Sequence, residues 1–82
     1  MIASSQIRAA RALLNWSGVV LSEKSGVSLK TLRRYEAQEG IPVANTSVLM
    51  SIKACFEEVG IEFIGDPLKN PGVVLYLESK HP

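Results

Sequence analysis

The stretch GVSLKTLRRYE carries three basic side chains within five residues, at Lys30, Arg33 and Arg34. Ammonium and guanidinium groups donate hydrogen bonds to phosphate oxygens and to the acceptor atoms of guanine, so this spacing suits contact with a nucleic acid. The same residues would also suit an ordinary solvated helix surface. The choice between the two depends on whether the neighbouring sequence turns all three cations to one outward face.

A helix over about residues 28–38 would produce such a face, because successive side chains turn by about 100°. Leu32 and Tyr35 then point to one side, where we expect them to pack on other helices. Leu29 and the three basic side chains cluster on the opposite side, where we expect the cations to face solvent. Leu29 is open between two roles, a partly buried residue of the turn and an apolar contact for a thymine methyl. Ser28 is the expected cap, and its hydroxyl together with the first helical amides would be placed to meet a phosphate.

The preceding residues predict a second short helix within WSGVVLSEKSG, capped by Ser17, with Leu21 pointing inward and Gly26 ending it. Only the turn SGVS separates this helix from the next. Two short helices joined by a tight glycine turn, the second exposing cations, form the arrangement that places a recognition helix in a major groove. We therefore interpret residues 28–38 as a recognition helix.

Two further helices are predicted, one on each side of this pair. The first begins at a serine cap, Ser4 or Ser5, and ends near Asn15. The other follows the chain-breaking Gly40 and Pro42 and spans Asn45 or Thr46 to about residues 59–60. The inward side chains expected for these two helices are Ile7, Ala10, Leu14, Val48 or Leu49, Ile52, Cys55 or Phe56, and Val59.

In the last 22 residues, the apolar side chains change from helical spacing to short runs typical of β-strands. IEFI and VVLYLE read as two short strands separated by GDPLKNPG, a stretch rich in turn residues. An isolated hairpin is marginal in water, so we expect it to pack on the helices, pair with another chain, or both. The predicted fold is mainly α, with a four-helix domain over residues 1–60 and a C-terminal β-hairpin extension over residues 61–82 that is a candidate dimerisation element.

The run WSGVVLSEKSGVSLKTLRRYEAQEG resembles the helix-turn-helix of the Cro/cI-like (XRE) transcriptional regulators, and QIRAARALLNWS resembles the first helix of that family. The resemblance covers about residues 4–60. The ending, with GIEFI and NPGVVL, is similar to that of a group of short bacterial regulators. The positions that carry the helix-turn-helix pattern are Trp16, Ser17, Leu21, Gly26, Val27, Ser28, Leu32 and Glu36.

This resemblance implies roles for individual residues. Leu29, Lys30 and Arg34 match positions that touch base edges, and Thr31 and Arg33 are near enough to contact phosphates or bases. Arg11 and Glu36 match a pair that commonly forms a salt bridge and orients the recognition helix. The full set of residues expected to contact DNA is Ser17, Ser28, Leu29, Lys30, Thr31, Arg33 and Arg34.

Three departures from the family pattern are visible. Gly18 stands where the family has a glutamine that often anchors a phosphate or a base. Ser22 replaces a small alanine in a tight contact between helices. A hairpin takes the place of the family's fifth helix, and dimerisation through its strands is our expectation.

The distribution of charge along the chain agrees with a protein that has one face for binding a polyanion. Residues 1–40 carry six basic and three acidic side chains, whereas residues 41–82 carry three basic and five acidic ones. This asymmetry is hidden in the net charge of +1.

Enzyme chemistry is not expected. The sequence has one histidine, His81, and one cysteine, Cys55, and we find in it no nucleophile–base spacing, metal-ligand cluster or phosphate-binding glycine loop. We expect no catalytic residues, no metal and no cofactor. Cys55 reads as a core residue.

The leading hypothesis is therefore a sequence-specific regulator that binds double-stranded DNA as a homodimer that reads two half-sites. The absence of a signal peptide or a membrane-length apolar run predicts a cytoplasmic protein without a membrane partner. The resemblance to short bacterial regulators implies a bacterial source. The alternatives are a protein-interaction module that keeps the helical fold, or an antitoxin that binds both DNA and a toxin. In either alternative, residues 61–82 are the candidate site for a protein partner.

Overall fold

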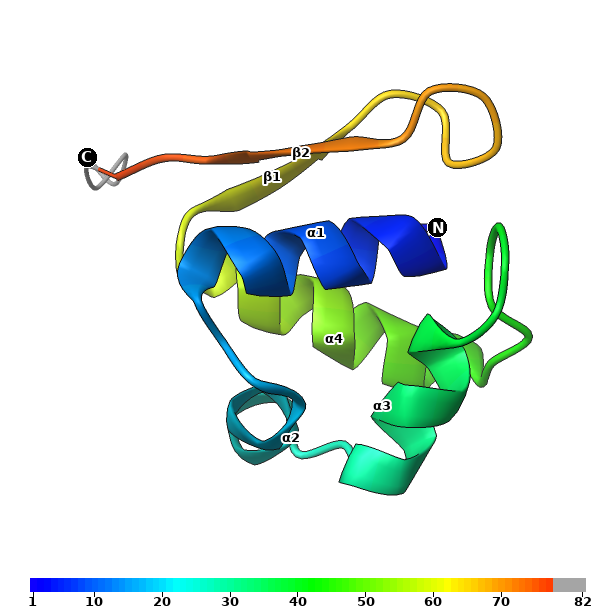
Figure 1. The fold of residues 1–82 in the computed structure, drawn as a ribbon, viewed down its shortest axis with the longest axis vertical. Coiled ribbons are helices and arrows are strands. Elements are labelled where there is room, and N and C mark those ends of the chain that lie inside the picture. Colours follow the sequence, from blue (N-terminus) through cyan, green and yellow to red (C-terminus); the bar gives the residue numbers. More distant parts are fainter. Residues whose placement is uncertain (78–82) are drawn as a thin grey trace.

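A computed structural model of the chain describes residues 1–77, which form four helices and a two-stranded antiparallel sheet. Figure 1 shows the hairpin lying over α1, with α4 beside α1 and with α2 and α3 on the side away from the hairpin. The elements are α1 (Ser4–Leu14), α2 (Gly18–Ser25), α3 (Leu29–Glu36), α4 (Thr46–Glu58), β1 (Ile61–Ile64) and β2 (Gly72–Leu75). The predicted mainly helical class is confirmed.

The ends of three helices follow the local capping chemistry of the sequence. The Ser17 hydroxyl accepts a hydrogen bond from the Val20 amide at 3.1 Å, and the Ser28 hydroxyl accepts one from the Thr31 amide at 3.2 Å. The Asn45 side chain caps α4 in the same way. These caps and the bounds of α2 were correctly predicted.

The serine cap expected for α1 is wrong. Ala3 occupies the cap position, and the amide of Ala3 donates to the side-chain oxygen of Gln6 at 2.8 Å. Ser4 is instead fully buried, and its hydroxyl donates to the Tyr35 carbonyl at 2.7 Å. Ser4 therefore links the start of α1 to the end of α3, a tertiary contact that the local pattern did not reveal.

Two other boundaries differ from the predictions. Helix α3 ends at Glu36, two residues short of the expected Gln38, whose side chain instead accepts a hydrogen bond from the Val43 amide at 2.8 Å. Helix α4 ends at Glu58, so Val59 leaves the inward stripe and is 39% exposed. The inward position predicted for Val59 is therefore wrong.

The core lies where the four helices meet the hairpin. Leu49, Ile52, Cys55 and Phe56 of α4 are buried in it. The Phe56 ring stacks on Trp16 with centroids 5.7 Å apart and meets the edge of Phe63 at 6.0 Å. The remaining buried apolar members of this cluster are Ile2, Ile7, Ala10, Leu21, Val27, Leu32, Tyr35 and Ile61.

The hairpin packs on the helices, which is one of the arrangements that the sequence predicted for it. Phe63, Val73 and Leu75 lie against the core from the two strands. The buried Gln6 amide donates to the carbonyls of Ile64 and Gly72 at 3.2 and 2.9 Å, so α1 holds the far end of the hairpin.

Strand β2 ends at Leu75, earlier than the predicted stretch VVLYLE. The last residue of that prediction, Glu78, lies outside the described residues, as do His81 and the rest of the predicted extension beyond residue 77. In residues 1–77, no helix is long and apolar enough to cross a membrane.

Candidate nucleic-acid interface

The turn between α2 and α3 is fixed by its own side chains and by a left-handed glycine. Gly26 ends α2 at φ +75°, a conformation that side chains bearing a Cβ rarely adopt. The Ser22 hydroxyl donates to the Val27 carbonyl at 2.6 Å, while the Val27 side chain is buried below the turn. Ser22 thus serves as a hydrogen-bond donor that stabilises this turn.

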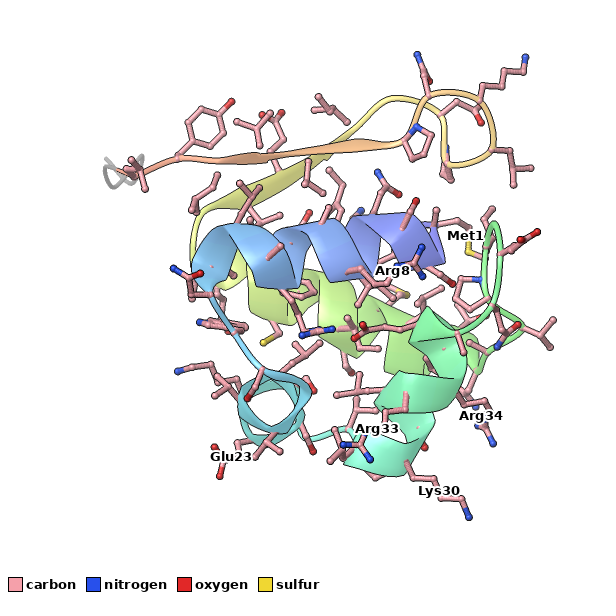
Figure 2. All side chains as sticks on the ribbon, in the orientation of Figure 1. Met1, Arg8, Glu23, Lys30, Arg33 and Arg34 are labelled. Carbon is pink, nitrogen blue, oxygen red and sulfur yellow. The ribbon has the colours of Figure 1, made fainter. Side chains whose placement is uncertain are left out.

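Helix α3 separates its side chains as the sequence predicted. Leu32 and Tyr35 are 1% and 2% exposed, whereas Lys30, Arg33 and Arg34 are all exposed. Figure 2 shows Lys30 and Arg34 pointing away from the body of the protein, whereas Arg33 lies on the side of α3 that faces α2. Arg33 and Arg34 also lie in the last turn of the helix, where the helix dipole favours positive charge.

The predicted pair of Arg11 and Glu36 is present. The Arg11 guanidinium donates from Nη2 to Glu36 Oε1 at 2.7 Å and from Nε to Glu36 Oε2 at 2.9 Å, so the pair has a bidentate geometry. The remaining nitrogen, Nη1, donates to the carbonyl of Trp16 at 3.0 Å. The hydrogen bond to Glu36 raises the pKa of Arg11 above its ordinary value. One side chain thereby connects α1, the start of α2 and the end of α3.

Arg8 adds a second link at the same point, and sequence reasoning missed it. Its exposed guanidinium donates to the backbone carbonyl of Glu36 at the end of α3. The spacing of Arg8 and Arg11, one helical turn apart, is the signal that could have indicated it. Both arginines of α1 therefore hold the same residue of α3.

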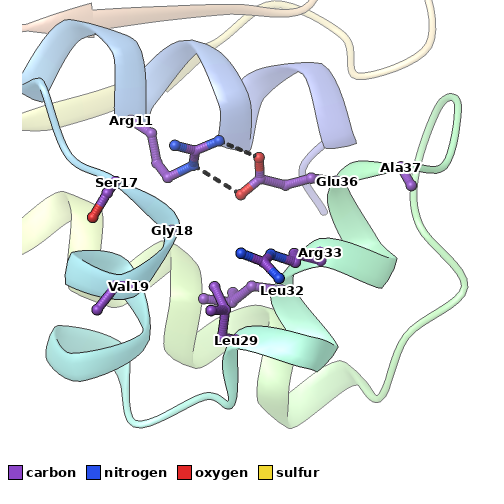
Figure 3. A pocket seen from close by; sticks show the side chains of 9 residues that line it. All are labelled: Arg11, Ser17, Gly18, Val19, Leu29, Leu32, Arg33, Glu36 and Ala37. Atoms are coloured by element: carbon purple, nitrogen blue, oxygen red, sulfur yellow. Dashed lines mark hydrogen bonds and ion pairs between the residues drawn. The ribbon is translucent and has the colours of Figure 1, made fainter.

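An open hollow of about 480 Å³ lies between the start of α2 and the side of α3. Figure 3 shows Arg33 and Leu29 extending from α3 toward α2, with the Arg11–Glu36 pair bordering the hollow on the α1 side. The hollow is lined by Arg11, Ser17, Gly18, Val19, Leu29, Leu32, Arg33, Glu36 and Ala37.

Leu29 occupies the space next to Gly18. A Cβ atom placed on Gly18 would lie 3.0 Å from Leu29 Cδ1, tighter than ordinary van der Waals contact. Leu29 is correspondingly half-buried, as the interpretation of it as a partly buried turn residue predicted. The missing side chain at Gly18 and the apolar first residue of α3 are thus spatially coupled.

The other candidate residues are placed as follows. Ser17 and Ser28 are exposed at the starts of α2 and α3, and both hydroxyls already accept a backbone hydrogen bond. Ser28 also donates to the Thr31 hydroxyl at 2.9 Å. Thr31 is half-buried at the edge of the face. The structure therefore gathers the candidate set around α3 and the α2 start, with Lys30 and Arg34 the most outward.

Residues 1–77 contain no group of three or more His, Cys, Asp or Glu side chains arranged to hold a metal ion. The chain matches no family model, and neither the curated proteins nor the solved structures contain a match to it.

Proposed function

We propose that this chain is a sequence-specific regulator that binds double-stranded DNA, related in design to the Cro/cI-like (XRE) regulators that its sequence resembles. Helix α3 enters the major groove, and the chain acts as a homodimer. The observation that carries the proposal is the outward face of α3, on which Lys30, Arg33 and Arg34 are exposed while the opposite face is buried.

The charge of this face is not neutralised within the described chain. Across residues 1–77, the side chains of Lys30 and Arg33 form no hydrogen bond or ion pair, and Arg34 only approaches the ring of Tyr35, at 5.6 Å. The acidic residue of α3, Glu36, is already held by Arg11. The surface next to solvent is therefore positive, as a phosphate backbone requires.

The exposed cations of α3 point in different directions, so they are assigned different contacts with DNA. Lys30 and Arg34 point outward from successive turns of α3, so they are assigned to base edges in the groove. Arg33 turns toward the start of α2, so it is assigned to a backbone phosphate. Phosphate contacts set the position of the helix, whereas base contacts provide the discrimination.

A homodimer follows from the small number of side chains that one short helix presents. Helix α3 has eight residues, and its two outward cations reach few base pairs. Two copies related by a two-fold axis would read half-sites about one helical turn apart, and a palindromic site would mirror that symmetry.

Selection from a pool of random duplex DNA tests this function. The full chain is expected to enrich a motif with two-fold symmetry, and its affinity is expected to fall steeply as salt rises. A pool without any enriched motif after repeated rounds would contradict the proposal. A stable complex with another protein in cell extract, together with that negative result, would favour the protein-interaction alternative.

A further inference from the structure

The outer edge of β2 carries backbone groups that no strand of the described chain pairs. The sheet has only two strands in residues 1–77, in the order β1-β2. The Tyr76 amide donates to the Gly60 carbonyl at 2.9 Å, which fixes the alternation of the ladder. Because Val74 is paired with Glu62 in that register, its backbone groups point toward β1, and those of Val73 and Leu75 point to the outer edge.

We propose that β2 pairs antiparallel with β2 of a second copy about a two-fold axis at Val74, forming a continuous four-stranded sheet. In this register Val73 of each copy lies opposite Leu75 of the other. Each of these two residue pairs exchanges two N–H to C=O hydrogen bonds, which satisfies all the outward backbone groups of the strand. The edge is therefore complementary to itself.

The side chains of β2 fit this pairing. Val73 and Leu75 pack toward the core, so Val74 lies on the opposite face of the sheet by strand alternation. The axis would bring the two Val74 side chains directly opposite one another, and such β-branched cross-strand pairs stabilise sheets. Strand β2, Gly72–Leu75, also has no charged residue that would oppose pairing.

The other edge of the sheet is unsuitable for the same arrangement. The outward backbone groups of β1 belong to Ile61 and Phe63, so a two-fold axis there would pass at Glu62. Two Glu62 carboxylates would then lie directly opposite each other, which is destabilising. Charge therefore distinguishes β2 from β1 as the pairing edge.

The two-fold symmetry also places both α3 helices where they could bind the same DNA duplex. This step rests on the proposed function. The two-fold axis of an antiparallel strand pair is perpendicular to the sheet, so the helices of both copies lie on the same face of the joined sheet. Figure 1 shows α2 and α3 beyond α1, on the side away from the hairpin. Both α3 helices would consequently face one DNA duplex.

Sedimentation of the full chain over a range of concentrations tests the pairing. The wild type is expected to show a monomer–dimer equilibrium. Val74→Glu should weaken the dimer by about fivefold or more, since like charges would meet across the axis. Val74→Lys should weaken it less, because each lysine would lie opposite Glu62 of its own copy. An equimolar mixture of the two variants should recover the dimer, because opposite charges would then meet.

Leu68→Glu is the matched control, since it adds the same charge as Val74→Glu to an exposed position of the hairpin loop, and it should leave the equilibrium unchanged. Circular dichroism must show that each variant is folded. A wild type that stays monomeric, or a dimer that Val74→Glu does not weaken, would overturn the pairing. A dimer that selects no DNA motif would overturn the proposed function alone, and a monomer that selects one would overturn only the pairing.

Discussion

Arg11 and Glu36 join α1 to α3 through two parallel hydrogen bonds of 2.9 and 2.7 Å. The same guanidinium reaches the carbonyl of Trp16, next to the start of α2. The pair is partly shielded from solvent, with the two side chains 26% and 12% exposed. It therefore fixes the end of the helix that carries the outward cations relative to both neighbouring helices.

Replacing Glu36 with glutamine should destabilise the fold by about 1–3 kcal/mol, because the partly buried Arg11 would lose its charged partner. Urea unfolding followed by circular dichroism measures the change. Lys53→Gln is the control, because it breaks an exposed ion pair with Glu57 at 3.8 Å and should cost at most about 1 kcal/mol. Equal losses from the two variants would contradict a special role for Glu36.

The double variant Arg11→Met, Glu36→Leu separates orientation from stability. Replacing both members of an ion pair with apolar residues can restore stability lost in the single variant. DNA affinity should remain below that of the wild type, since the bidentate geometry that sets the angle of α3 would be absent. Full recovery of affinity to a selected site would show that the pair does not orient the helix.

Gly18→Ala should alter DNA preference more than stability. The added methyl would press on Leu29 Cδ1, the flexible end of a side chain, so Leu29 moves and the unfolding free energy changes by only about 0.5 kcal/mol. Leu29 begins α3, so its movement should change the preferred base pair at the edge of each half-site. Selected motifs for the variant and the wild type provide the measurement, and identical motifs with unchanged stability would refute the coupling.

Gln6→Ala should loosen the hairpin. Gln6 is 2% exposed, and its side chain makes hydrogen bonds with Ala3, Ile64 and Gly72. The substitution leaves the buried Ala3 amide without this partner and removes two partly buried hydrogen bonds to the hairpin. We expect a loss of about 2–3 kcal/mol by urea unfolding. Amide hydrogen exchange should accelerate in β1 and β2. Gln38→Ala, whose hydrogen bonds are exposed, is the control and should cost less.

The Cys55 thiol should keep its proton in the folded chain, so the stability of the fold should decrease in alkaline solution. Burial raises the pKa of its thiol, so the folded chain holds the proton more tightly than the unfolded chain. The resulting stability is fully present below the unfolded pKa, about 8.5, and is lost as pH rises from there through the folded pKa. Cys55→Ala should show a smaller decline over that window in urea titrations, and an identical decline would contradict this role.

Features set by neighbouring residues could be predicted from the sequence. Ser17, Gly26 and Ser28 each act on backbone groups a few residues away, so their capping roles follow from local chemistry. The outward placement of Lys30, Arg33 and Arg34 follows in the same way from helical periodicity around two buried residues.

Features that depend on packing could not be predicted locally. Ser4 reads as a cap, but its hydroxyl is used by Tyr35, 31 positions later. Nothing in the residues next to Gln6 indicates that its side chain donates hydrogen bonds to Ile64 and Gly72 of the hairpin. Leu29 could not be assigned between turn and face, because its contact with Gly18 depends on how closely α2 approaches α3.

The double variant Lys30→Ala, Arg34→Ala tests the central claim most directly. Its binding to the DNA site selected by the wild type should fall by at least about a hundredfold, because two base-reading side chains are lost. The control Lys53→Ala, Lys69→Ala removes two cations outside α3 and should retain specific binding. A double variant that remains folded and still binds the selected site with wild-type affinity would contradict the account.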